Sequence, residues 1–98
     1  MARIEEELES ELALAEPTKY KVLLHNDDYS TMEFVVEILV KVFHKSINQA
    51  EDIMIAIHKS GRAVCGIYTF EIAETKVYQV KEFAKSEGFP LLATMEEV

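Results

Sequence analysis

The stretch KYKVLLHNDDYSTME, residues 19–33, contains a strand, a loop and the start of a helix. Alternate residues from Tyr20 to Leu24 are apolar, a spacing of two that is typical of a β-strand. The Asn-Asp-Asp segment then ends the strand, because these side chains hydrogen-bond their own backbone and favour turns. Ser30 to Glu33 has the form of a capping box, so we expect the Ser30 hydroxyl to cap a helix that begins directly after it.

Helix and strand patterns continue through the rest of the chain. The elements expected after the first strand are a helix that fades near residue 45, a helix from a second capping box at Ser46 to Gly61, a strand over 62–69, a helix from Thr69 to Gly88, and a strand over 91–95. In the strand over 62–69, simple alternation puts Ala63, Cys65 and Ile67 on one face and Val64, Gly66 and Tyr68 on the other. Both faces are rich in apolar residues, so we expect both to be partly buried.

The order β-α-α-β-α-β predicts an α+β domain. Its helices are long enough to cover one sheet face, so we expect a two-layer α/β sandwich of three helices on a three-stranded antiparallel sheet. The chain has 98 residues, which suffices for one domain and one core. We expect this core domain to span residues 18–98. Residues 1–17 should form a flexible acidic extension, because residues 1–16 hold six Glu and one Arg.

The charge and composition exclude several classes of partner. The formal net charge is −8, so the field of the molecule repels nucleic acids and anionic lipids. No apolar run approaches the roughly 20 residues that a membrane-spanning helix needs, and the N-terminus does not resemble a secretory signal. A single cysteine, Cys65, excludes an internal disulfide. We therefore expect a cytoplasmic protein whose partners are neither nucleic acids nor membranes.

Two groups of polar residues are candidates for a binding site. Asn26, Asp27 and Asp28 lie where a strand passes into a helix, a common place for functional groups, although the same residues are ordinary in turns. His58 lies near the end of the second helix, on the face that carries Met54, where a histidine is also common for purely structural reasons.

Catalysis and metal binding have less support in the sequence. His25, His58, Asp27 and Asp28 offer metal-ligand types, but they lack the tight spacing of known metal motifs. There is no glycine-rich phosphate loop and no GxSxG motif, and Cys65 lies in the middle of a strand. From the residues alone, the sequence indicates a small acidic binding module.

Several spaced motifs together resemble the ClpS family, the adaptors that deliver N-degron substrates to an ATP-dependent Clp protease. The likeness extends from about residue 20 to residue 94. The motifs are Tyr20-Lys21-Val22, Asn26-Asp27-Asp28-Tyr29, Met32-Glu33-Phe34-Val35, His58 three residues before Gly61, Cys65-Gly66, and Ala73-Glu74-Thr75-Lys76. The resemblance implies a non-enzymatic adaptor without a cofactor or a metal. Its substrates would begin with Leu, Phe, Tyr or Trp.

The resemblance also implies which residues bind. A polar rim that holds the α-amino group of the substrate would consist of Asn26, Asp27, Asp28 and His58. A hydrophobic pocket for the first side chain would consist of Ser30, Met32, Val35, Met54, Ile57 and Leu91. Glu71 and Lys76 would contact the N-terminal domain of a ClpA- or ClpC-type AAA+ unfoldase.

The residue types of the rim suit this ligand. A protonated amine has three donors and no acceptor, and amide, carboxylate and neutral imidazole groups all supply acceptors. Two other hypotheses stay open on the sequence. One is a structural protein–protein interaction domain without N-terminal recognition, and the other is a small metal-dependent enzyme.

Overall fold

The computed structural model describes residues 17–98. Residues 1–16, to which most of the predicted flexible extension belongs, lie outside this range. The elements in chain order are β1 (Lys19–His25), α2 (Met32–Lys41), α3 (Ile47–Ser60), β2 (Arg62–Thr69), α4 (Phe70–Glu87) and β3 (Leu92–Glu97). The predicted order β-α-α-β-α-β is confirmed, and the last strand begins and ends slightly later than expected.

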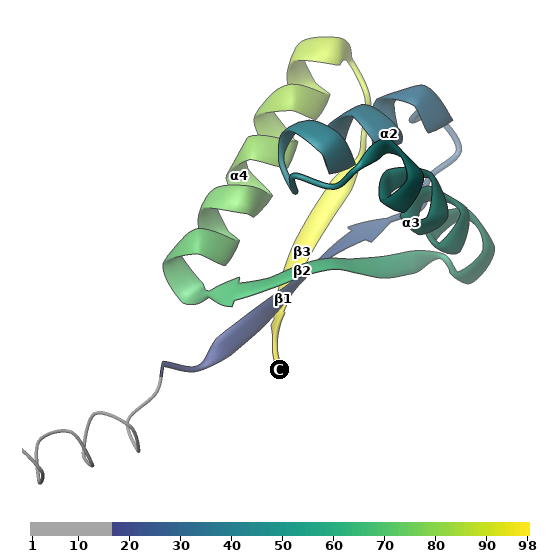
Figure 1. Cartoon of the computed structure of the whole chain (residues 1–98). Helices are drawn as coiled ribbons and strands as arrows, with labels where there is room; N and C mark the ends of the chain where they lie inside the picture. Colours follow the sequence, from purple (N-terminus) through teal and green to yellow (C-terminus); the bar gives the residue numbers. More distant parts are fainter. Residues whose placement is uncertain (1–16) are drawn as a thin grey trace, which may run out of the picture.

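The three strands form one antiparallel sheet in the order β2-β1-β3, with β1 in the centre. All three helices lie on one face of this sheet (Figure 1). α4 packs across all three strands, α3 packs on β2, and α2 lies against α3. Val22 and Leu24 of β1 are fully buried beneath the helices. The predicted two-layer α/β sandwich is therefore confirmed.

The helix ends follow their capping residues, with one difference from the prediction. Ser46 and Gln49 form the expected capping box at the start of α3, and Gly61 ends that helix in the left-handed conformation with φ 87°. For α2, however, the N-cap is Thr31, whose hydroxyl accepts from the backbone N–H of Phe34 at 3.1 Å. The prediction that Ser30 caps this helix is wrong, because its hydroxyl is bonded to the preceding loop.

The predicted alternation in β2 is also wrong. The pairing of β2 with β1 passes over Cys65, which is the extra residue of a β-bulge. The bulge shifts the alternation by one residue, so Val64 and Ile67 are both exposed while Cys65 is buried. Ile67 therefore does not share a face with Cys65 and Ala63.

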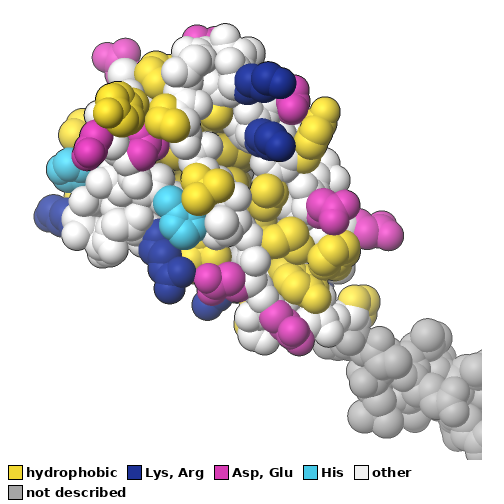
Figure 2. All heavy atoms as spheres, turned by 180° about the vertical axis from the view of Figure 1, so that it is seen from behind, with side chains coloured by type: hydrophobic (Ala, Val, Ile, Leu, Met, Phe, Trp, Pro, Cys, Tyr) yellow, Lys and Arg dark blue, Asp and Glu magenta, His cyan; other side chains and the backbone are white. Residues whose placement is uncertain are grey.

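The sheet face opposite the helices carries hydrophobic and charged side chains together (Figure 2). Glu96 of β3 lies 3.7 Å from Lys21 and 3.2 Å from Arg62. Both ion pairs are exposed, so each contributes at most about 1 kcal/mol. His25 also belongs to the sheet, and its Nε2 lies 2.6 Å from the Thr94 hydroxyl oxygen.

Gly66 provides the space for the ring of Tyr68 two residues later. The ring occupies the position into which a Cβ on Gly66 would project. The Lys76 ammonium lies 5.8 Å from the centre of the same ring and donates to the carbonyl oxygen of Val42, at 2.7 Å. These contacts join α4 to β2 and to the end of α2.

We expect Gly66→Ala to destabilise the protein by about 1–3 kcal/mol, because the added methyl group overlaps the Tyr68 ring. Urea unfolding followed by circular dichroism measures this loss. In a Tyr68→Ala background the same substitution should cost much less. An equal cost in both backgrounds would show that the ring is not the cause.

Candidate functional site

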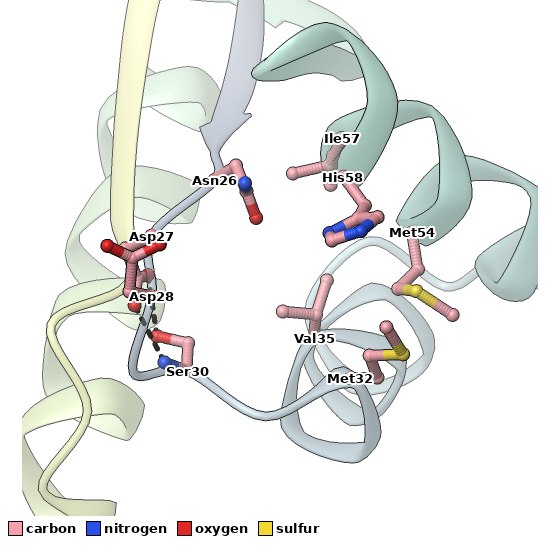
Figure 3. Close-up of a pocket in the computed structure, with 9 residues that line it drawn as sticks. All are labelled: Asn26, Asp27, Asp28, Ser30, Met32, Val35, Met54, Ile57 and His58. Carbon is pink, nitrogen blue, oxygen red and sulfur yellow. Dashed lines mark hydrogen bonds between the residues drawn. The ribbon is translucent and has the colours of Figure 1, made fainter.

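A cavity of about 250 Å³ lies between the loop that follows β1 and the helices α2 and α3 (Figure 3). It is lined by Asn26, Asp27, Asp28, Ser30, Met32, Val35, Met54, Ile57 and His58. The structure thus brings together nine of the ten rim and pocket residues named from the sequence. The tenth, Leu91, does not line the cavity. It is only 5% exposed and belongs to the hydrophobic core.

Asn26 is fixed beside the end of α3 by its main chain. Its backbone N–H donates to the carbonyl oxygen of Gly61, the residue that ends α3, at 2.8 Å. The side chain is not needed for this bond, so it stays available to the cavity. Figure 3 shows the Asn26 amide and the His58 ring directed toward the same space from opposite sides.

Asp27 organises the loop with its carboxylate. Oδ1 accepts from the backbone N–H groups of Tyr29 and Ser30, at 2.8 and 2.6 Å, and Oδ2 accepts from the Ser30 hydroxyl at 2.7 Å. Figure 3 shows the two bonds from Ser30. Burial alone would raise the pKa of Asp27, but these hydrogen bonds outweigh it and hold the pKa below its ordinary value of 3.8. The carboxylate is therefore charged at neutral pH. Oδ2 still has room for another donor.

Hydrophobic side chains from two helices form the rest of the cavity. Val35 of α2 and Ile57 of α3 are buried and form its inner wall. Met32 and Met54 lie side by side at the end away from the Asn-Asp-Asp loop (Figure 3). Met32 is 55% exposed, so its flexible thioether chain stands at the opening.

The cavity combines polar groups on two sides with an apolar wall (Figure 3). Its polar groups are an amide, two carboxylates and an imidazole, and none of the nine lining residues is a Lys or an Arg. A cationic donor group with an attached apolar side chain complements this arrangement.

The structure also places the residues that were considered for metal binding and catalysis. Among residues 17–98, no three His, Cys, Asp or Glu side chains converge in the way that a metal site requires. His25 is engaged by Thr94 in the sheet and does not line the cavity. Burial raises the pKa of the Cys65 thiol to about 12, so this sulfur is protonated at neutral pH and is a poor nucleophile.

Glu71 and Lys76, named as unfoldase contacts, lie on α4 and not at the cavity. Glu71 is exposed in the first turn of the helix. Lys76 is half-buried, and its ammonium group is bonded to the end of α2.

Some contributors to the site were not identified from the sequence. The carbonyl of Gly61 and the backbone N–H of Tyr29 both help to position the loop. The glycine that ends α3 is visible as a helix stop, but its hydrogen bond to Asn26 depends on the folded chain path.

A family model described as ATP-dependent Clp protease adaptor protein ClpS matches residues 15–94. The chain belongs to the ClpS family. It is thus an adaptor of the ATP-dependent Clp protease. The ClpS adapter protein of Wolinella succinogenes is 53% identical over 93 residues, which cover 95% of this chain and 91% of the relative. That of Desulforapulum autotrophicum is 58% identical over 81 residues, 83% of this chain and 78% of the relative.

A solved ClpS structure has the same fold. ClpS2 of Agrobacterium tumefaciens bound to L-phenylalaninamide superposes with a TM-score of 0.82 and 40% sequence identity, covering 85% of this chain and all of that one. The described part of this ClpS chain, residues 17–98, contains no helix that is long and apolar enough to cross a membrane.

Proposed function

We propose that this chain binds the free α-amino group and the bulky hydrophobic first side chain of N-degron substrates, and delivers them to a Clp AAA+ unfoldase. It acts as a binding protein and not as an enzyme. The observation that carries the proposal is a cavity in which hydrogen-bond acceptors of the Asn-Asp-Asp loop and His58 lie beside buried Val35 and Ile57.

The polar groups of the cavity suit a protonated amine. The Asn26 amide, the Asp27 carboxylate and the His58 imidazole offer acceptors to its three N–H donors. Each charge-assisted hydrogen bond contributes about 1.5–3 kcal/mol, and an unpaired acceptor in the occupied cavity would cost a similar amount. An amide in place of the amine has one N–H and no charge, so it should be rejected.

The size of the cavity suits one side chain. Sites for drug-sized ligands occupy about 300–1,000 Å³, and this cavity of about 250 Å³ falls below that range. A Leu, Phe, Tyr or Trp side chain buried against Val35 and Ile57 contributes about 1.5–3 kcal/mol. L-Phenylalaninamide, present in the ClpS2 structure, has both a free α-amino group and an aromatic side chain.

We assign unfoldase docking to the first turns of α4. Glu71 is exposed there between the exposed side chains of Phe70 and Ile72, and such a mixed apolar and acidic surface suits the N-terminal domain of a ClpA- or ClpC-type partner. Lys76 contributes through its bond to Val42, which holds α4 in position.

Three peptides test the proposed function by fluorescence anisotropy. A peptide with a free N-terminal Leu should bind, and its acetylated twin and an N-terminal Ala peptide should each bind at least about tenfold more weakly. Affinity that is indifferent to acetylation would contradict the proposal and would favour an interaction domain without N-terminal recognition.

A further inference from the structure

A second hollow lies beside the cavity, between α2 and α3. This hollow, the side groove, has a volume of about 420 Å³ and is lined by Met32, Glu33, Val36, Glu51, Met54 and Ile55. Met32 and Met54 line both spaces. These two methionine side chains lie together in Figure 3.

The side groove has an apolar surface with acidic residues on both helices. Ile55 of α3 is 44% exposed and Val36 of α2 is half-buried, so apolar surface is open to solvent here. Glu33 on α2 and Glu51 on α3 are exposed. An occupant should therefore combine an apolar side chain with positive charge.

We propose that the side groove binds the third residue of the substrate and selects an apolar side chain there, with Lys or Arg next to it. This inference rests on the proposed function of the cavity. The carbonyl of the first residue is attached to the same Cα as its amine, so the substrate chain leaves through the opening of the cavity, where Met32 is 55% exposed and, with Met54, borders the side groove.

The geometry of an extended peptide selects the third residue. Side chains alternate in direction, so the first and third point to the same side, about 6.6 Å apart. With the first side chain in the cavity, the third reaches beyond the two methionines into the side groove, and the second points to solvent.

Charge argues against other occupants of the side groove. A second copy of this chain carries a net charge of −8, and residues 1–16 of the chain itself hold six Glu. Both would be repelled by Glu33 and Glu51. A substrate chain with basic residues is attracted and is already tethered beside the groove by its first residue.

The test compares labelled peptides that begin Leu-Ala-Leu-Lys, Leu-Ala-Ser-Lys and Leu-Leu-Ser-Lys. Leu at the third position should tighten binding about fivefold over Ser, and Leu at the second position should give no such gain. Ile55→Ala should remove the gain and leave the affinity for the Leu-Ala-Ser-Lys peptide unchanged. Ile47→Ala is the matched control, because Ile47 is an exposed isoleucine of the same helix outside both hollows.

A second pair of variants tests the charge. In the peptide, replacing the Lys that follows the third residue by Glu should weaken binding about threefold. In the protein, Glu51→Gln should reduce this difference in affinity between the two peptides. Asp52→Asn is the control and should leave the difference unchanged. The inference is overturned if Leu at the third position binds no more tightly than Ser. It is also overturned if that difference in affinity persists in a folded Ile55→Ala variant. If Leu peptides still bind only with a free amine in that case, the proposed function stands. If acetylation has no effect, the proposed function itself is wrong.

Discussion

Asp27→Ala should lower the affinity for a peptide with a free N-terminal Leu by about 30- to 100-fold. The substitution removes a charged acceptor from the rim, the two hydrogen bonds that hold the backbone of Tyr29 and Ser30, and the hydrogen bond from the Ser30 hydroxyl. A hydrogen bond to a charged group contributes about 1.5–3 kcal/mol, so the loss of one substrate contact together with loop order gives an effect of this size. Isothermal titration calorimetry with the Leu peptide measures it.

Two further variants separate the charge of Asp27 from its effect on the loop. Ser30→Ala removes only the bond to Oδ2, so it should weaken binding about threefold. Asp28 is the neighbouring acid, and within residues 17–98 its carboxylate has no hydrogen bond to the loop. Asp28→Ala should therefore also have only a small effect on the affinity for the Leu peptide. If Asp28→Ala costs as much as Asp27→Ala, the loss reflects overall negative charge and not the Asp27 contacts.

The same carboxylate should make the loop sensitive to acid. Its pKa is lower in the folded protein than the ordinary 3.8, so ionised Asp27 stabilises the folded state fully at pH values above 3.8. This stabilisation is lost as the pH falls through the lowered pKa. At pH 7 the full contribution is therefore present.

The double variant Asn26→Ala/His58→Ala should bind the Leu peptide about 100-fold more weakly than the parent, and each single variant about tenfold more weakly. Each substitution removes one acceptor for the α-amine, at about 1.4 kcal/mol or more. The fold should be unaffected, because Asn26 is held by its backbone N–H and both side chains are exposed. Fluorescence anisotropy measures the affinities, and urea unfolding checks the stability.

Lys59→Ala is the control for His58→Ala, since Lys59 is the next exposed residue of α3 and does not line the cavity. It should leave the affinity unchanged. If the double variant binds the Leu peptide as tightly as the parent, neither Asn26 nor His58 binds the α-amine.

The parts of the fold that depend on local sequence could be predicted. The Ser46 capping box and Gly61 define the ends of α3 with side chains and backbone only a few residues apart. The bulge at Cys65 could not be predicted, because it is a mismatch between two strands that are distant in sequence. The cap of α2 was misplaced by one residue because Ser30 and Thr31 both have hydroxyl groups, and Asp27 engages the first of them.

The resemblance to the ClpS family identified more of the residues at the cavity than the periodicity of the sequence did. The spacing of Met54, Ile57 and His58 on one helical face indicated a shared surface, and the structure places all three at the cavity. Leu91 was included by position in the resemblance, but its side chain is buried in the core and does not line the cavity. The side groove depends on how α2 and α3 approach each other, which no local pattern specifies.

The hydrogen bond from Asn26 to Gly61 has a thermodynamic consequence. It joins the loop to the end of α3, so the polar groups on both sides of the cavity belong to one preorganised unit before any peptide arrives. Ordering a loop residue on binding would cost about 1–2 kcal/mol of backbone entropy, and here that cost has already been met during folding. If the cavity binds substrates as proposed, a small adaptor can hold a short terminal segment without closing around it, and the rest of the substrate stays accessible.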